Sequence, residues 1–212
     1  MAARRRGKFI VFEGIDGAGT STQSQMTADW LMNRGELVHV TCEPTRGPIG
    51  SLLRQILSGR VVAKGNKGGS EPVDPATIAL LFAADRIDHL QSEIEPHLSA
   101  GRHVICDRYV LSSYAYQAVD VDLKFVRAIN AKAKAPDLTF FLDVAADVAM
   151  ARIEAARHER DRFENLTFQR KVVDRYRTQV AEYRQGDVYS FNGELKPGQL
   201  ATKIRDALEN YL

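Results

Sequence analysis

The sequence predicts an α/β fold in which a parallel β-sheet is covered by helices on both faces. Short β-rich runs alternate with longer segments of helical period along the 212 residues, a pattern typical of right-handed β-α-β crossovers. Turn residues separate these segments: Gly35 ends the first helix, and Pro136-Asp137 divides a later helix from a strand. Because 44% of the residues are hydrophobic, we expect one domain spanning residues 1–212 with its own core.

Each element is predicted from its local pattern. Strands are expected at the short β-rich runs Lys8–Phe12, Leu37–Thr41, His103–Cys106, Leu138–Asp143 and Val188–Phe191. Helices are expected at Ser21–Arg34, Pro75–Ser99, Asp122–Lys134, Ala146–Ala156, Leu166–Gln185 and Gly198–Tyr211. The glycine-rich polar stretch Lys64–Pro72 follows no strand, so it is predicted as a mobile surface loop between helices rather than as a phosphate-binding loop.

Composition narrows the class of protein. The net charge of +2 indicates neither a basic nucleic-acid surface nor an acidic tail. The two cysteines, Cys42 and Cys106, lack metal-binding spacing, which favours a reduced, cytoplasmic setting. Arg4 to Arg6 precede only the short apolar run Phe9–Phe12, and no segment reaches the roughly 18 apolar residues of a membrane span. We therefore expect residues 1–7 to form a solvated basic arm, and neither nucleic acid nor a membrane to be a partner.

The most specific local signal is a glycine-rich turn between the first strand and the first helix. Gly14, Gly17 and Gly19 permit a backbone whose successive N–H groups face phosphate oxygens, at the positive end of the helix dipole. This order is typical of a P-loop, and the residues expected to hold ATP are Gly14, Gly17, Ala18, Gly19, Thr20, Ser21 and Thr22. The alternative is a turn that joins strand to helix without a ligand.

The loop departs from the usual GxxxxGK[ST] pattern at one position. Thr20 stands where lysine would reach the β- and γ-phosphates, whereas Ser21 remains as the expected Mg²⁺ ligand. A charge-assisted hydrogen bond contributes about 1.5–3 kcal/mol, so its loss would cost roughly 10- to 100-fold in rate unless another cation replaces it. A weakly active or non-catalytic nucleotide-binding protein is therefore one alternative.

A second signal follows the strand predicted at His103–Cys106. Asp107 lies at the carboxyl end of this strand, where ligands of α/β proteins collect, and could hold Mg²⁺ through water. Arg108 can bind a phosphate with its planar guanidinium group. The alternative is an ordinary Asp-Arg pair on the surface.

Taken with four further segments, these motifs resemble the thymidylate kinases, a family of P-loop nucleoside monophosphate kinases, over nearly the whole chain. The resemblance rests on the loop FEGIDGAG, on Cys42–Gly50, Leu80–Arg86, Asp107–Tyr109 with Ser112–Gln117, and Asp161–Glu164. It implies the P-loop kinase fold, ATP- and Mg²⁺-dependent phosphorylation of dTMP to dTDP in dTTP synthesis, and a homodimer. A kinase for dUMP, another pyrimidine nucleotide or a deoxynucleoside is the other alternative.

The same resemblance assigns roles at the acceptor site. Phe82 is expected to stack on thymine while Arg86 and Gln117 hydrogen-bond its polar edge. Core packing is the alternative for Phe82, and a surface salt bridge with Asp85 or Asp88 is the alternative for Arg86.

Further acceptor-site roles follow from the resemblance. Tyr109 is expected against the deoxyribose, or else in the core, and Asp16 near the acceptor sugar and phosphate, or else as a turn residue. Glu43 and Arg46 would help to close the site, although Cys42 stands where many family members have arginine. The remaining expected acceptor-site residues are Asp107, Ser112 and Tyr116.

The arginine-rich stretch Arg157–Asn165 is predicted as a mobile lid. Family members with glycine at the position of Gly17 supply a catalytic arginine from the lid, so Arg157, Arg160 or Arg162 would compensate for Thr20. The alternative is a solvated face with Glu154, Glu159 and Asp161. The other arginines, including Arg152 and those within Arg170–Arg177, are predicted on solvated helix faces.

Overall fold

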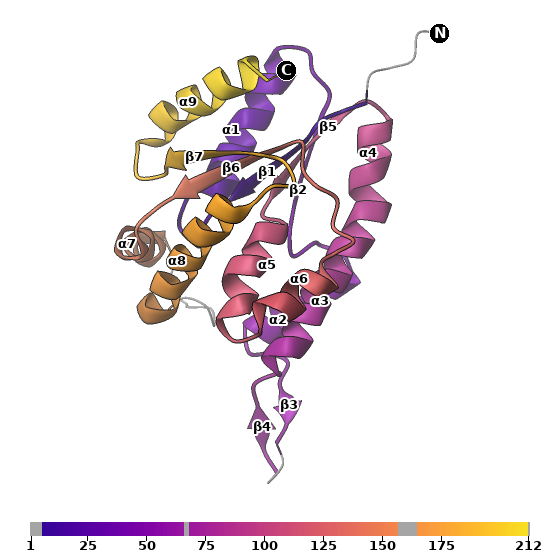
Figure 1. Cartoon of the computed structure of the whole chain (residues 1–212), viewed down its shortest axis with the longest axis vertical. Helices are drawn as coiled ribbons and strands as arrows, with labels where there is room; N and C mark the ends of the chain where they lie inside the picture. Colours follow the sequence, from indigo (N-terminus) through magenta and orange to yellow (C-terminus); the bar gives the residue numbers. More distant parts are fainter. Residues whose placement is uncertain (1–5, 66–67, 157–164, 212) are drawn as a thin grey trace.

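A five-stranded parallel sheet forms the centre of the protein (Figure 1). The computed structural model describes residues 6–65, 68–156 and 165–211. The strand order is β2-β5-β1-β6-β7, with bounds β1 Phe9–Glu13, β2 Val38–Cys42, β5 His103–Asp107, β6 Leu138–Asp143 and β7 Asp187–Asn192. The five predicted strands are confirmed, and none of their ends differs by more than one residue.

Helices cover both faces of this sheet, as predicted. Figure 1 shows α1 and α9 on one face and α4, α5 and α8 on the other. The α-helices are α1 Thr20–Asn33, α2 Pro48–Leu57, α3 Pro75–His89, α4 Glu95–Ser99, α5 Val110–Tyr116, α6 Leu123–Ile129, α7 Ala146–Ala156, α8 Leu166–Glu182 and α9 Pro197–Glu209. Within the described residues, no helix has the length and apolar character needed to cross a membrane.

Strand order explains where the helices lie. The connection from β1 to β2 crosses the sheet in one direction, and each later connection runs in the opposite direction. Because these crossovers are right-handed, α1 lies on one face and the helices of the later crossovers lie on the other. The chain thus leaves the neighbouring strands β1 and β5 toward opposite faces, which opens a crevice at their carboxyl ends.

The central strand β1 is buried along its whole length. The rings of Phe9 and Phe12 have no exposed surface, and Phe12 packs on Phe140 of β6 with ring centroids 5.2 Å apart. Burying each such side chain stabilises the fold by about 1.5–3 kcal/mol. The strand that leads into the glycine turn is therefore held firmly between β5 and β6.

Side-chain caps fix several helix starts where the sequence predicts them. Asp74 accepts hydrogen bonds from the backbone of Ala76 and Thr77 at the start of α3. Asp122 caps α6 and Asn165 caps α8 in the same way. Each such cap contributes about 1 kcal/mol.

The stretch Lys64–Pro72, predicted as a mobile surface loop between helices, lies between α2 and α3 and has a short strand pair that was not predicted. This stretch contains a short antiparallel hairpin of β3, Ala63–Lys64, and β4, Ser70–Glu71. Gly68 and Gly69 adopt φ values of 80° and 93°, which other residues rarely adopt, so the glycines that indicated a loop instead form the hairpin turn. The hairpin extends away from the body of the protein (Figure 1).

The helix predicted at Pro75–Ser99 is interrupted. A π-helical segment, η1 Leu90–Ile94, separates α3 from α4. Pro96 explains the interruption, because it has no N–H to donate to the carbonyl four residues earlier. The helix predicted at Asp122–Lys134 ends early at Ile129, where the Asn130 side chain donates to the Val126 carbonyl and accepts from Arg86.

Close packing explains one glycine inside α2. A Cβ at Gly50 would overlap the backbone carbonyl of Thr45, whereas a Cβ at Gly198 of α9 would meet no atom within 4 Å. We predict that Gly50→Ala lowers the free energy of unfolding by at least about 2 kcal/mol despite the higher helix propensity of alanine. Gly198→Ala is the matched control. It should raise the free energy of unfolding slightly, by no more than about 1 kcal/mol.

Urea denaturation followed by circular dichroism measures both variants. Equal stabilities of Gly50→Ala and Gly198→Ala would show that the contact between α2 and the loop before it is not tight.

Candidate active site

The glycine turn after β1 leaves the start of α1 open to a ligand. Gly17 and Gly19 have φ values of 79° and 93°, and Gly19 precedes α1 without any side-chain cap. A Cβ at Gly19 would meet nothing within 4 Å. The first amides of a helix have no acceptor within the helix, and the first turn of α1 carries no acidic residue. The predicted residues Gly14 to Thr22 thus form a turn and helix start suited to an anion.

Thr20, the residue in place of lysine, lies at the first position of α1 and is buried, with 5% of its surface exposed. Its methyl group lies near Gly14, since a Cβ built at Gly14 would be 3.4 Å from Thr20 Cγ2. Ser21 and Thr22, which follow it, are exposed. Thr20 thus packs inside the turn, whereas the next two hydroxyls face solvent.

Two predicted Mg²⁺ ligands meet at the same edge of the sheet. The Ser21 hydroxyl donates a hydrogen bond to Asp107 Oδ2. Asp107 Oδ1 is buried and has no hydrogen-bond partner within the described ranges. A hydroxyl beside an unpaired carboxylate oxygen matches the oxygen ligands that Mg²⁺ prefers, so these residues fit the ion that the sequence predicts.

Buried Glu13 organises the start of α5 from the end of β1. Its Oε1 accepts hydrogen bonds from the backbone N–H groups of Tyr109 and Ser112 at 3.0 and 3.2 Å. Its Oε2 accepts from the hydroxyls of Ser112 and Tyr176 at 2.6 and 2.9 Å. Burial raises the pKa of Glu13 above its ordinary value of 4.5, although hydrogen bonds from Ser112 and Tyr176 oppose this shift.

Arg108 occupies a strained backbone position next to Glu13. Its φ of 72° is the only positive value among the described non-glycine residues, a conformation that costs about 1–3 kcal/mol and is typical of functional sites. The Arg108 backbone N–H donates to Phe12 at 2.8 Å, and its guanidinium group lies 5.3 Å from the centre of the Tyr116 ring. These contacts direct the side chain toward the glycine turn.

Asp16 of the glycine turn receives the Arg108 guanidinium group. Arg108 Nη2 lies 2.8 Å from Asp16 Oδ1, and Gln169 of α8 donates to the other carboxylate oxygen at 3.2 Å. The Asp16 backbone N–H donates to the Tyr116 hydroxyl at 2.9 Å. The partner of Arg108 is therefore Asp16, and the alternative of a surface pair with Asp107 is wrong.

A cavity of about 100 Å³ lies beside this ion pair and is partly open to solvent. Most of the predicted acceptor-site residues line it. The lining residues are Asp16, Glu43, Pro44, Leu57, Phe82, Arg86, Arg108, Tyr109, Ser112, Ser113, Tyr116 and Gln117. The structure thus brings residues from five separate segments of the chain to one cavity next to the glycine turn.

Arg86 is buried in the wall of this cavity with only 1% of its surface exposed. Its Nη2 donates to Glu43 Oε2 at 2.6 Å and to the Tyr109 carbonyl at 3.1 Å, and its Nη1 donates to Ser113 and Asn130. Its Nε–H has no hydrogen-bond partner in the part of the chain that the structure describes. The alternative of a surface salt bridge with Asp85 or Asp88 is wrong.

Two other cavity residues carry unpaired polar atoms. Gln117 Oε1 and the Tyr109 hydroxyl are buried without a hydrogen-bond partner among the described residues. The Tyr109 ring is fully buried and packs edge-on against Phe9 at 5.0 Å. Phe82 is half-buried and packs against the small apolar cluster of Leu53, Ile56 and Ile78.

The loop after β2 is held by side chains from α2 and α3. Asp85 accepts hydrogen bonds from the Thr45 backbone and hydroxyl at 2.7 and 2.6 Å, and Arg54 donates to the carbonyls of Pro44 and Thr45. This loop brings Glu43 and Pro44 to the cavity, whereas Arg46 is exposed and does not line it.

Arg152 does not lie on a solvated face, contrary to the prediction. Its guanidinium group donates to the carbonyls of Gly17 and Gly193 at 3.3 and 3.0 Å. A Cβ at Gly17 would overlap the Ala149 carbonyl, so α7 packs directly on the glycine turn. The predicted lid arginines Arg157, Arg160 and Arg162 lie outside the described residues, and their role stays a prediction.

Several residues that build the site were not identified from the sequence. Glu13 was assigned no role, Ser113 and Asn130 bind Arg86, and Gln169 binds Asp16. Their partners are far away in sequence, so only the complete fold reveals them.

The raised pKa of Glu13 predicts a pH-dependent contribution to stability. Folded Glu13 keeps its proton to higher pH than the unfolded chain, so its contribution falls as pH rises from 4.5 through the raised folded pKa. We expect the difference in unfolding free energy between the wild type and Glu13→Gln to decrease across this range. Urea titrations from about pH 4 to 8 measure it, and a difference that increases with pH would contradict the burial of Glu13.

Comparison with known proteins connects this site to one family. A sequence model of thymidylate kinase matches residues 12–208. A protein named probable thymidylate kinase from Methanococcus vannielii is 43% identical over 178 residues, which cover 84% of this chain and 79% of that protein. Another from Thermococcus kodakarensis is 44% identical over 79% of this chain and 82% of its own length.

The similarity also extends over nearly the complete length of one relative. The protein named thymidylate kinase from Trichormus variabilis is 34% identical over 213 residues, or 97% of each chain. With the parallel sheet, the glycine turn and the adjoining cavity, these matches identify the chain as a member of the thymidylate kinase family.

Proposed function

We propose that this protein transfers the γ-phosphoryl group of ATP to dTMP and releases ADP and dTDP. The observation that carries the proposal is the adjacency of two binding features. The glycine turn before α1 suits a polyphosphate, and Asp16 and Arg108 form its boundary with a cavity lined by Phe82, Arg86 and Gln117.

The unpaired atoms in the cavity are complementary to a thymine edge. Arg86 Nε–H is a buried donor and Gln117 Oε1 a buried acceptor, and neither has a partner among the described residues. Thymine presents a carbonyl oxygen beside a ring N–H, which supplies the matching acceptor and donor. Cytosine presents an amino group beside an unprotonated nitrogen, which reverses both roles. Half-buried Phe82 supplies an aromatic ring against which the base would stack.

Phosphate groups would meet at Arg108. In the transfer, an acceptor phosphate oxygen forms a bond to the γ-phosphorus while the bond from that phosphorus to the β-phosphate bridging oxygen breaks. An acceptor phosphate is already anionic at neutral pH, so the reaction needs alignment and charge neutralisation more than a strong base. Arg108 is held between Asp16 and Tyr116, where its guanidinium group would orient the acceptor phosphate.

Ser21 and Asp107 would hold Mg²⁺ beside the polyphosphate. When bound, this ion neutralises charge on the β- and γ-phosphates. The unpaired Oδ1 of Asp107 supports this assignment. Asp16 is already paired with Arg108, which favours a positioning role for its carboxylate.

A coupled assay of ADP release tests the proposed function. We expect turnover with dTMP, at least about 100-fold lower kcat/KM with dCMP, and a roughly 10- to 200-fold reduction with dUMP, which lacks one methyl group. Thymidine lacks the accepting phosphate and should release no ADP. Binding of ATP and dTMP without any ADP release would instead support the non-catalytic alternative.

A second prediction concerns the cation that replaces the loop lysine. We propose that Arg157, Arg160 or Arg162 compensates for Thr20, and at least one of the three single alanine variants should lower kcat by tenfold or more. Arg34→Ala is the control, because Arg34 pairs with Glu209 at the opposite end of α1, and its kcat should stay within about twofold. Near-normal turnover of all three lid variants would exclude the compensation.

A further inference from the structure

His89 is a buried residue of α3 that the proposed function does not use. Its side chain has no exposed surface, and it follows Arg86 by three residues, so both lie on the same face of the helix. His89 does not line the cavity. Whatever it contributes to acceptor binding must therefore act through a neighbouring residue.

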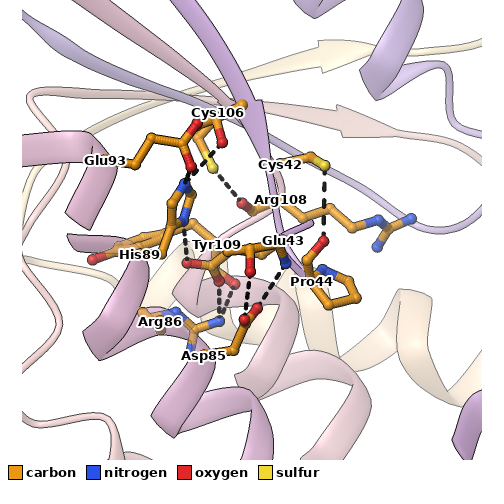
Figure 2. Close-up of polar contacts among 12 residues, drawn as sticks. Cys42, Glu43, Pro44, Asp85, Arg86, His89, Glu93, Cys106, Arg108 and Tyr109 are labelled. Carbon is orange, nitrogen blue, oxygen red and sulfur yellow. Dashed lines mark hydrogen bonds and ion pairs between the residues drawn. The ribbon is translucent and has the colours of Figure 1, made fainter. Parts of the chain in front are cut away.

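Glu43 connects His89 to Arg86. His89 Nδ1 lies 3.2 Å from Glu43 Oε1, while Arg86 Nη2 lies 2.6 Å from Glu43 Oε2. Figure 2 shows Glu43 between the two side chains. Because a carboxylate paired with arginine only accepts hydrogen bonds, the geometry requires His89 Nδ1 to carry a proton and to donate it to this bond.

The other ring nitrogen of His89 faces a separate group of side chains. Nε2 lies 2.8 Å from the Thr41 hydroxyl and 3.4 Å from Glu93 Oε2. Glu93 also binds His39, whose ring stacks on His97 at 3.7 Å. These contacts hold the imidazole from the side opposite Glu43, and this prevents the ring from turning away.

We propose that His89 is a positioning residue for the acceptor nucleotide. By donating from Nδ1 to Glu43, it fixes the carboxylate that orients Arg86, and this keeps the unpaired Nε–H of Arg86 available to the base in the cavity. The inference rests on the proposed function, since it names dTMP as the ligand of that cavity.

Two amide substitutions separate the two ring nitrogens. In His89→Asn the amide nitrogen can occupy the place of Nδ1 and still donate to Glu43, whereas in His89→Gln it can reach only the place of Nε2. We expect His89→Gln to raise the KM for dTMP and its dissociation constant in calorimetry about tenfold, the effect of one hydrogen bond to a charged group. His89→Asn should stay within about threefold, and both variants should keep the KM for ATP within about twofold.

Thr41→Val is the control for the other nitrogen, because it removes the hydroxyl at Nε2 and leaves Glu43 bound. Its KM for dTMP should stay within about threefold of the wild-type value. A purely structural role for His89 would reduce the fraction of active enzyme, which lowers kcat but leaves both KM values unchanged.

Unchanged dTMP affinity in His89→Gln, or equal losses in His89→Gln, His89→Asn and Thr41→Val, would overturn the proposal. Failure of the proposed function is distinct, because the wild-type enzyme itself would then neither bind nor phosphorylate dTMP.

Discussion

The parallel pairing of β1 with β5 determines the geometry of the whole site. In this register Phe12 lies opposite Asp107, so the glycine turn and the Asp107-Arg108 segment begin side by side. The next helices leave toward opposite faces of the sheet, and the crevice between them is the place where α/β proteins of this kind bind their ligands. Glu13 and the Phe12 carbonyl of β1 bind the backbone of Tyr109 and Arg108. A single strand pair thus places the proposed Mg²⁺ ligands and the arginine that we propose to bind phosphate.

Buried charge is the second constraint on this site. The side chains of Arg86 and Glu43 are only 2% and 3% exposed, and removing each ion from water costs several kcal/mol. Ser113 and Asn130 accept hydrogen bonds from Arg86, and His89 donates one to Glu43, so most of the remaining polar atoms of the pair are satisfied. An apolar pair of similar size would often be equally stable. We infer that the charged network is present because it offers a donor to a ligand, at the unpaired Nε of Arg86.

Local sequence signals were sufficient for the sheet, most helix starts and the glycine turn. They depend on short-range periodicity and on residues such as Asp74 and Asp122, which cap the helices that they precede. The short helices α2 and α5 were not predicted.

The sequence alone suggested Asp85 or Asp88 as partners of Arg86, but its partner is Glu43, 43 residues away. Arg152 was predicted on a solvated helix face because the backbone carbonyls that it binds belong to loops distant in sequence, and local patterns do not reveal them. The lid arginines, the role of Arg46 and the homodimer stay predictions.

The central claim is that the polyphosphate site and the nucleobase cavity adjoin at Asp16 and Arg108. Adenosine and thymidine joined through their 5′ oxygens by a chain of five phosphates tests it most directly, because one molecule can then occupy both sites. Calorimetry in the presence of Mg²⁺ should give a dissociation constant at least about 100-fold below that of either ATP or dTMP alone, since linking makes the second binding event intramolecular. Binding no tighter than that of the stronger single nucleotide would contradict a continuous site.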